Sequence, residues 1–485
     1  MNFPGGGTSG PSSASIFVTK LNPSATAVLF TTVLGSLTLG SPQNLQDLLT
    51  AQYVTGLGVD QDGSIYLAGF DLAANFPTTP KAWVPNSGTQ FVTKLDSSGK
   101  LVYSSYVGPP SWALRPQRLR VRNGIAYIAG FVSAPAFSGT AGALQPNIAG
   151  GQDLFALAMA PDGSAPLFVT AFGGSGDESL NDMTLDAAGN IVLIGASSSA
   201  NLPVTADALP YPPPVPPNSE SILVRIDPTG STLVSSTWLG TAGVNAGSVT
   251  SDGGLVIAGV TPFPPDLTSG APSYSINLGG TVPGYLAKLA PGSNRLAWST
   301  VELGNDNFES GIVTDAGGNV YWSGFPDAIS GGAIGAVQSG GITGISADGS
   351  QLRYSSPVPG VTDWVRMVPG PGGILYVAGY TYSGALPVTP GVIQPQINPG
   401  PAQQPYDPLA STDGFVGKLD LSAFDSGNFF VMSPSSGYSL VWRIGEPAPQ
   451  ALTIPVNGGG GSLSAAPGPG LVASLFPYAI ACLEH

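Results

Sequence analysis

The feature that most constrains the fold of this chain is a short pattern that recurs six times, at intervals of roughly 55 to 65 residues. Each copy has an apolar run, a polar turn that contains Gly, and a run of alternating apolar residues. Asp or Asn tolerates such a turn and Gly supplies the positive φ of a tight hairpin, so each copy predicts a β-hairpin. The six copies cover residues 56–70, 118–131, 182–196, 247–260, 311–325 and 366–380.

A second pair of strands, also joined by a short polar turn, lies between these hairpins. Residues 91–108 and 222–240 show it most clearly, and other copies begin at Phe17, Phe155, Tyr285, Ile342 and Phe415. Two hairpins make a four-stranded antiparallel sheet, which buries both faces only when neighbouring copies pack around an axis. The sequence therefore predicts an all-β fold, a β-propeller of four-stranded antiparallel blades. The alternative is a long array of β-sandwich domains.

The number of blades follows from the two kinds of hairpin. The first kind occurs six times and the second begins seven times, so six and seven blades are both compatible with the count. We expect six, with strands from the two ends of the chain sharing one blade. The repeat stops at about Ala423, so we expect a propeller over residues 1–422 and a C-terminal tail over residues 423–485.

Four elements recur in a fixed order, and YSSYVG, VDQDGSIYLAGF, NFPTTPKAW and FVTKLDSSGKLVYS show them best. Weaker copies of the third element are LPVTADAL (202–209) and LPVTPGVIQP (386–395). Over residues 3–420 the chain resembles the bacterial seven-bladed β-propeller (SBBP) repeat. This resemblance implies a propeller of an exported bacterial protein, secreted or at the cell surface, and implies no particular activity.

The tail has a resemblance of its own. Residues 438–465 resemble the first strands of bacterial Ig-like modules of the BACON type, some of which occur with carbohydrate-active proteins. The stretch is too short for a complete sandwich, so we expect a truncated Ig-like domain or a cap. The closing Leu483-Glu484-His485 resembles the remnant of a purification tag.

Composition excludes several classes of partner and chemistry. The chain has 29 acidic and 15 basic residues, and the basic residues look scattered, so we expect no basic face for nucleic acid. No apolar run is long enough for a membrane span, and the opening residues lack the features of a signal peptide. The only histidine is His485 and the only cysteine is Cys482, which excludes an internal disulfide and a Ser-His-Asp triad. We expect a monomer.

Long connections rich in Pro and Gly suggest where a partner would bind. They span residues 70–90, 131–153, 197–220, 260–284, 324–341 and 380–414. Propeller topology puts them at the end of the blades opposite the hairpin turns, and long loops on a rigid scaffold are the usual place for recognition. We therefore expect binding on the long-loop face. The alternative is that these loops are merely tolerated insertions.

The segments that lead into the first strand of each repeat hold polar and aromatic residues that suit a sugar. Aromatic rings stack on its apolar face, while carboxylates and amides pair with its hydroxyls. The candidate ligand-binding residues are Trp112, Arg115, Arg118, Asp177, Glu178, Asp182, Asn305, Asp306, Asn307, Glu309, Asp363, Trp364 and Arg366. Each of them can equally be a solvated loop residue.

The leading functional hypothesis is a non-catalytic binding or scaffolding module that recognises a polysaccharide or a protein. The alternative is a carbohydrate-active hydrolase or lyase that uses carboxylates such as Asp177 and Glu309 at the central opening. A third hypothesis is self-assembly through blade edges. We expect no cofactor, and calcium at Asp177, Glu178 and Asp182 is the one alternative.

Overall fold

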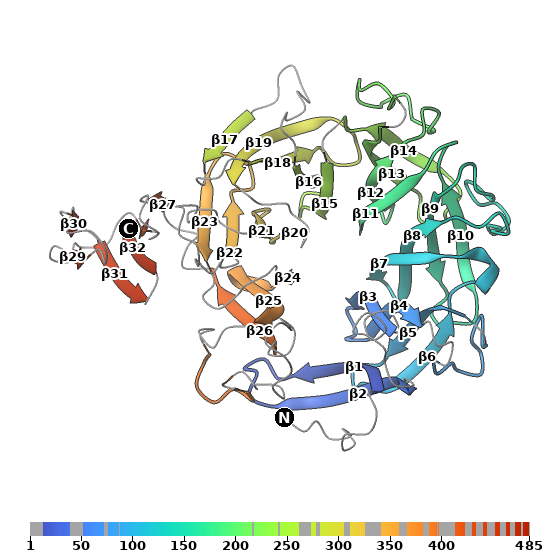
Figure 1. Ribbon diagram of the computed structural model, residues 1–485, viewed down its shortest axis with the longest axis horizontal. Helices are drawn as coiled ribbons and strands as arrows, with labels where there is room; N and C mark the ends of the chain where they lie inside the picture. The colour runs from blue at the N-terminus through green and yellow to red at the C-terminus, as the bar shows by residue number, and fades with distance from the viewer. Residues whose placement is uncertain are drawn as a thin grey trace, which may run out of the picture. The chain divides into compact units, whose positions relative to one another are not determined.

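The computed structural model shows an all-β protein, a six-bladed propeller of four-stranded antiparallel sheets (Figure 1). Helix in the described residues is confined to two 3-10 turns, Pro110–Trp112 and Pro371–Gly373, and none has the length and apolar character that a bilayer span requires. The structure describes residues 13–38, 52–71, 76–86, 88–215, 218–240, 243–260, 273–277, 282–304, 311–324, 341–357, 366–381, 388–394, 396, 413–421, 429–432, 440–443, 452–455, 462–465, 471–476 and 479–484.

All six predicted hairpins of the first kind are present. Their turns carry the expected glycines, such as Gly63 with φ +79° and Gly124 with φ +80°. The hairpins are β3 (Gln52–Val59) with β4 (Ile65–Asp71), β7 (Arg115–Arg122) with β8 (Ile125–Val132), β11 (Glu178–Leu185) with β12 (Ile191–Ser197), β15 (Gly243–Val249) with β16 (Leu255–Val260), β20 (Ile312–Thr314) with β21 (Val320–Gly324), and β24 (Arg366–Pro369) with β25 (Ile374–Thr381).

The second kind of hairpin supplies the two outer strands of each blade. These strands are β1 (Ser13–Leu21) with β2 (Val28–Thr38), β5 (Gln90–Leu95) with β6 (Leu101–Tyr106), β9 (Asp153–Met159) with β10 (Pro166–Phe172), β13 (Glu220–Ile226) with β14 (Leu233–Trp238), β18 (Val282–Leu289) with β19 (Leu296–Gly304), β22 (Gly341–Ile345) with β23 (Leu352–Pro357), and β26 (Asp413–Asp420) next to β25. The six-blade prediction is therefore confirmed.

Strands β1 and β2 form a two-stranded sheet, and the described part of the β24–β26 sheet has three strands. One detail differs from the expectation: β17 (Ser273–Asn277) arises within the 260–284 connection and pairs parallel to β19. No strand is predicted there from the sequence, because β17 is a short run that pairs with the outer edge of a strand already formed.

The chain divides into two compact units. The first comprises Met1–Val249, Gly292–Arg295 and Val388–Pro395, and the second comprises Thr250–Pro291, Leu296–Pro387 and Gln396–His485. In the second unit, β27 (Phe429–Met432), β28 (Leu440–Arg443), β32 (Ala479–Glu484) and β31 (Leu471–Phe476) form one sheet, while β29 (Leu452–Pro455) and β30 (Ser462–Ala465) form another.

Apolar faces of neighbouring sheets pack together in the first unit. Ile16 and Val18 of β1 lie in one buried cluster with Ile65, Leu67 and Phe91 of the β3–β6 blade. Strands β1 and β2 therefore cover this blade as a preceding blade does.

A glycine contact repeats from blade to blade. The turn between the two outer strands of a blade carries a positive-φ glycine that lies against an aromatic ring of the preceding outer hairpin, and a Cβ there would lie between 2.2 and 2.5 Å from a ring atom. The backbone thus approaches the ring more closely than any side-chain-bearing residue allows. The pairs are Gly99 with Phe30, Gly163 with Tyr103 and Gly230 with Phe168 in the first unit, and Gly349 with Trp298 in the second.

The long connections of the first unit run along the outer strands. In three blades a Thr-x-x-Ala turn lies beside the middle of the last strand. The N–H and the hydroxyl of the threonine both donate to the backbone carbonyl of one strand residue. The threonine hydroxyl also accepts from the N–H of that same strand residue. The turns therefore form hydrogen bonds with N–H and C=O groups of the edge strands. Unpaired, these groups could form hydrogen bonds with a strand of another chain. The pairs are Thr79 with Ser104, Thr140 with Val169, and Thr205 with Ser236.

These connections also reach the hairpin-turn end of the next blade. The N–H of Trp83 donates to the carbonyl of Gly163, and the N–H of Leu144 donates to that of Gly230. Ile393 donates in the same way to Ala25, in the β1–β2 turn. The described connections of the first unit are therefore not gathered at one end of the blades, which differs from the expectation of a separate long-loop face.

Candidate functional site

The structure describes seven of the predicted site residues. Six of them lie in the first unit, on or beside β7 and β11, and Arg366 lies in β24 of the second unit. The other six, Asn305, Asp306, Asn307, Glu309, Asp363 and Trp364, lie outside the described residues. Separation of the suggested Asp177 and Glu309 pair therefore stays untested.

Trp112 packs as part of the core. Its ring lies 6.0 Å from that of Trp83 at 64° and 5.2 Å from that of Phe137, centroid to centroid. Phe137 is a buried residue of a long connection, so the half-buried Trp112 packs against that connection and stabilises its position. Arg115, at the start of β7, is exposed.

Asp182 joins three neighbouring strands. Its Oδ1 accepts from Arg118 Nε at 3.3 Å and from Arg120 Nη2 at 3.1 Å, both on β7. Its Oδ2 accepts from the N–H of Gly247 on β15 at 3.1 Å. A register shift between Leu180 and Asp182 in β11 places the carboxylate between the two neighbours. Arg118 and Asp182, two of the candidate ligand-binding residues, thus contact each other, and this contact joins neighbouring blades.

Glu178 is fully buried and its carboxylate is occupied. Oε1 accepts from the hydroxyls of Ser197 and Ser199, each at 2.6 Å, and Oε2 accepts from the N–H of Gly174 at 3.1 Å. Burial raises the pKa of Glu178, and the neighbouring Asp153 carboxylate raises it further, while these hydrogen bonds oppose the shift. Glu178 therefore holds together the loops around it.

Asp153 is the second buried carboxylate at this end of the blade. It accepts from Gln145 Nε2 at 2.6 Å and from the N–H groups of Ala149 and Gly150, and burial raises its pKa. Gly173 separates the two acids, because a Cβ there would lie 2.2 Å from Glu178 Oε2 and 2.6 Å from Asp153 Oδ1. Asp177 is exposed beside them. Within the described residues, no three Asp, Glu, His or Cys side chains are grouped as metal ligands.

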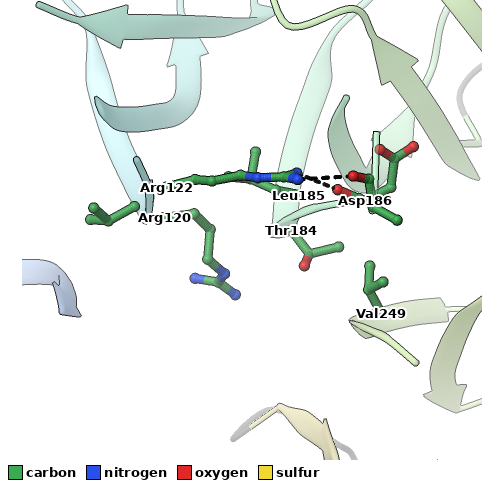
Figure 2. Close-up of a pocket in the computed structure, with 8 residues that line it drawn as sticks. Arg120, Arg122, Thr184, Leu185, Asp186 and Val249 are labelled. Atoms are coloured by element: carbon green, nitrogen blue, oxygen red, sulfur yellow. Dashed lines mark hydrogen bonds between the residues drawn. The ribbon is translucent and has the colours of Figure 1, made fainter. Parts of the chain in front are cut away.

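An open pocket of about 380 Å³ lies at the other end of the same strands. It lies beside the turns of the first hairpins, and Figure 2 shows the Arg120 and Thr184 side chains directed toward the same open side. Its lining residues are Arg120, Val121, Arg122, Thr184, Leu185, Asp186, Ala187 and Val249.

Arg122 is fixed at this pocket by the backbone. Nη1 donates to the carbonyl of Asp186 at 2.8 Å and Nη2 to that of Ala187 at 2.9 Å (Figure 2). The Asp186 carboxylate instead accepts from the N–H and the side-chain amide of Asn190. Among the described residues Arg122 therefore has two hydrogen bonds to neutral groups and no carboxylate partner.

Arg120, Arg122 and Thr184 were not among the residues predicted from the sequence. Strand β7 contains four of the chain's 15 Lys and Arg residues, Arg115, Arg118, Arg120 and Arg122, so the basic residues are not scattered as expected. The alternation of the last three within a predicted hairpin was the available signal, because alternate residues of a strand share a face. That face is directed toward β11.

No family model and no curated protein matches the chain. Among solved structures, a luciferin-regenerating enzyme is similar over 76% of this chain and 92% of its own, with 12% identity and a TM-score of 0.34. A gluconolactonase from Xanthomonas campestris is similar over 67% and 83%, with 12% identity and a TM-score of 0.34. An endo-arabinase from Bacteroides thetaiotaomicron is similar over 64% and 94%, with 14% identity and a TM-score of 0.30. Similarity at this level carries no argument about function.

Proposed function

We propose that this chain is the propeller of an exported bacterial protein of the seven-bladed repeat family, and that it is a non-catalytic module that binds a polysaccharide. The loop element of that repeat, present here as TTPKAW, GTAGAL and VTADAL, makes the same threonine contacts with an outer strand in three blades. A shared structural role for this element supports the family proposal. The Ig-like assignment of the tail is proposed on its sequence alone.

The observation that carries the binding proposal is the pocket of Arg120 and Thr184. Its volume, about 380 Å³, falls within the range of small-molecule and cofactor sites. Val121, Leu185 and Val249 give it an apolar wall, and Arg120 and Thr184 give it hydrogen-bonding groups. A sugar ring needs both, because its C–H faces pack on apolar surface and its hydroxyls need paired hydrogen bonds.

A sugar chain suits this pocket better than a protein surface does. A stable protein interface buries about 800 Å² on each partner over a broad area, whereas this site is a small hollow lined by eight residues. We therefore place recognition here, at the hairpin-turn end of β7, β11 and β15, in place of the long-loop face expected from the sequence.

The buried carboxylates support a non-catalytic role. A glycosidase needs two carboxyl groups free to face the scissile bond. Glu178 and Asp182 instead accept hydrogen bonds from their own neighbours through both oxygens. The pocket is lined by one acid, Asp186, whose carboxylate is bonded to Asn190.

The test is retardation of the protein in native gels that contain polysaccharides of known composition, with two matched variants. Ala187→Trp fills the pocket, while Ala188→Trp adds the same bulk at the next exposed residue, which does not line it. We expect at least one polysaccharide to retard the natural chain and Ala188→Trp, but not Ala187→Trp. Retardation unaffected by Ala187→Trp places binding elsewhere, and capture of a protein partner alone, or of nothing, rejects the proposal.

A further inference from the structure

We infer that the ligand of this pocket is anionic, and that Arg120 and Arg122 bind the carboxylate of a uronate-containing polysaccharide. This inference rests on the proposed function, since it names the chemical class of the ligand at the same site. It starts from the position of three arginines, Arg118, Arg120 and Arg122, on one face of β7 in a chain of net charge −14.

The three arginines are not equally neutralised. Arg118 lies against Asp182 and also donates to the backbone carbonyl of Asn181. Arg120 shares the same Asp182 oxygen, and its side chain is 38% exposed. Among the residues that the structure describes, Arg122 donates hydrogen bonds to the carbonyls of Asp186 and Ala187. One carboxylate therefore serves two guanidinium groups, and the third has none among the described residues.

Arg122 lines the pocket and has more N–H groups than its hydrogen bonds use. A guanidinium has five N–H groups, and the hydrogen bonds of Arg122 use two of them. Its contacts with two backbone carbonyls fix the plane of the group before any ligand arrives, which lowers the entropy lost on binding. A planar pair of donors matches the two oxygens of a carboxylate.

Thr184 adds a neutral group to this charged site. It lies on β11, lines the pocket beside the arginines, and its hydroxyl has no hydrogen-bond partner among the described residues. A hydroxyl can donate to a ring oxygen or accept from a sugar hydroxyl. With the apolar wall of Val121, Leu185 and Val249, the site offers one contact for each part of a uronate residue.

Because the whole chain is acidic, binding of an anionic ligand depends on these arginines. With 29 acidic residues against 15 basic ones, the average field of the protein repels anions. Binding of an acidic polymer therefore needs a local cation pair, and loss of either cation is not compensated by the rest of the surface.

Isothermal titration with polygalacturonate, its fully methyl-esterified form and a neutral arabinan tests this inference. We expect polygalacturonate to bind at least tenfold more tightly than the ester, which is the scale of one charge-assisted hydrogen bond. Arg120→Gln and Arg122→Lys are expected to weaken polygalacturonate binding by about tenfold or more for the same reason. The control Arg295→Gln changes an exposed arginine that does not line the pocket, and it should leave binding within about twofold.

The outcomes separate this inference from the proposed function. Equal binding of the ester and the acid, or of arabinan alone, rejects the anionic ligand and leaves polysaccharide binding intact. Binding of none of the three polymers, with no retardation in the gel experiment, rejects both.

Inorganic phosphate is the second probe: if it binds as tightly as galacturonate monosaccharide and both are lost in Arg120→Gln, the site takes small anions and the uronate assignment is wrong. Circular dichroism melts of each variant establish that it is folded.

Discussion

Asp182 accepts a hydrogen bond from the backbone N–H of Gly247 across 3.1 Å, and this contact ties β11 to β15. The other oxygen of the same carboxylate accepts from Arg118 and Arg120 of β7. One side chain thus connects the first strands of three consecutive blades. Because Asp182 is buried, with 7% of its surface exposed, water competes little for these bonds.

Removing this carboxylate should destabilise the first unit. We expect Asp182→Ala to lower the free energy of unfolding by about 2 to 3 kcal/mol, since two guanidinium groups and one N–H lose their acceptor, and the partial exposure of the arginines limits the loss. Urea denaturation followed by tryptophan fluorescence measures it. Asp177→Ala, at an exposed acid of the same segment, is the control and should stay within about 0.5 kcal/mol. Equal losses in both variants would contradict this role.

The buried Glu178 should make stability depend on pH in a defined direction. Its pKa in the folded protein is raised above the ordinary value of 4.5, chiefly by burial, so the folded state holds this proton more tightly than the unfolded state does. The resulting stabilisation is complete below pH 4.5 and is lost as the pH rises through the folded pKa. Glu178→Gln removes this titration, while the hydroxyls of Ser197 and Ser199 can accept from the new amide.

The measurement is the difference in unfolding free energy between Glu178→Gln and the natural chain at several pH values from 4 to 8. We expect the difference to move in favour of the variant as the pH rises. Taking the difference cancels the contribution that other acids make to the pH dependence of stability. Asp252 is an acid whose pKa is shifted in the opposite direction, because its hydrogen bond with Lys288 lowers the pKa to about 2. A difference that is constant, or that moves toward the natural chain, would show that Glu178 is not a net destabilising charge at neutral pH.

The hairpins could be predicted because their signals are local. Asn123 and Gly124 both have positive φ, as the tight turn between β7 and β8 requires, and these residue types tolerate it best. The strands on either side follow from alternation of apolar residues. Such signals need only a few neighbouring residues, so the fold and the count of six blades followed from the sequence.

The candidate site could not be predicted in the same way, because its contacts join residues far apart in the chain. Arg120 meets Asp182, 62 residues later, and Arg122 meets the carbonyl of Asp186, 64 residues later. Arg225 is a further example: it is only 2% exposed, and it donates to Asn294 and to the carbonyl of Ser293. The repeat length predicts that such residues are neighbours, but it does not specify which side chains pair or which carboxylates become buried.

The threonines of the long connections should stabilise the outer strands. Thr140 Oγ1 donates to the carbonyl of Val169 at 3.3 Å and accepts from its N–H at 3.1 Å. Thr140→Val keeps the shape of the side chain but leaves the Val169 N–H without this acceptor, while the Val169 carbonyl keeps the backbone N–H of residue 140, so we expect a loss of about 1 to 2 kcal/mol in urea denaturation. Thr140→Ser keeps the hydroxyl and should lose less than half as much. If Ser is as destabilising as Val, the methyl group and not the hydroxyl makes the contact that matters.

The close approach of Gly163 to Tyr103 allows backbone strain and side-chain contact to be measured separately. Gly163 has φ +72° and a Cβ there would lie 2.4 Å from the Tyr103 ring, whereas Gly292 has φ +62° with no atom within 4 Å of its Cβ position. Gly292→Ala should therefore cost about 1 kcal/mol, the price of the backbone conformation alone. Gly163→Ala should cost about 3 kcal/mol, because the buried ring has little room to move.

A double-mutant cycle identifies the ring as the source of the extra loss. Tyr103→Leu removes the ring atoms that the new methyl group meets, so Gly163→Ala should cost about 1 to 2 kcal/mol less in that background than in the natural chain. Tyr103→Leu should leave the cost of Gly292→Ala unchanged, since no atom of Tyr103 lies near Gly292. If the losses of unfolding free energy from Gly163→Ala and Tyr103→Leu are additive, the blades move enough to accommodate the new methyl group. The glycine is then required for its backbone conformation only.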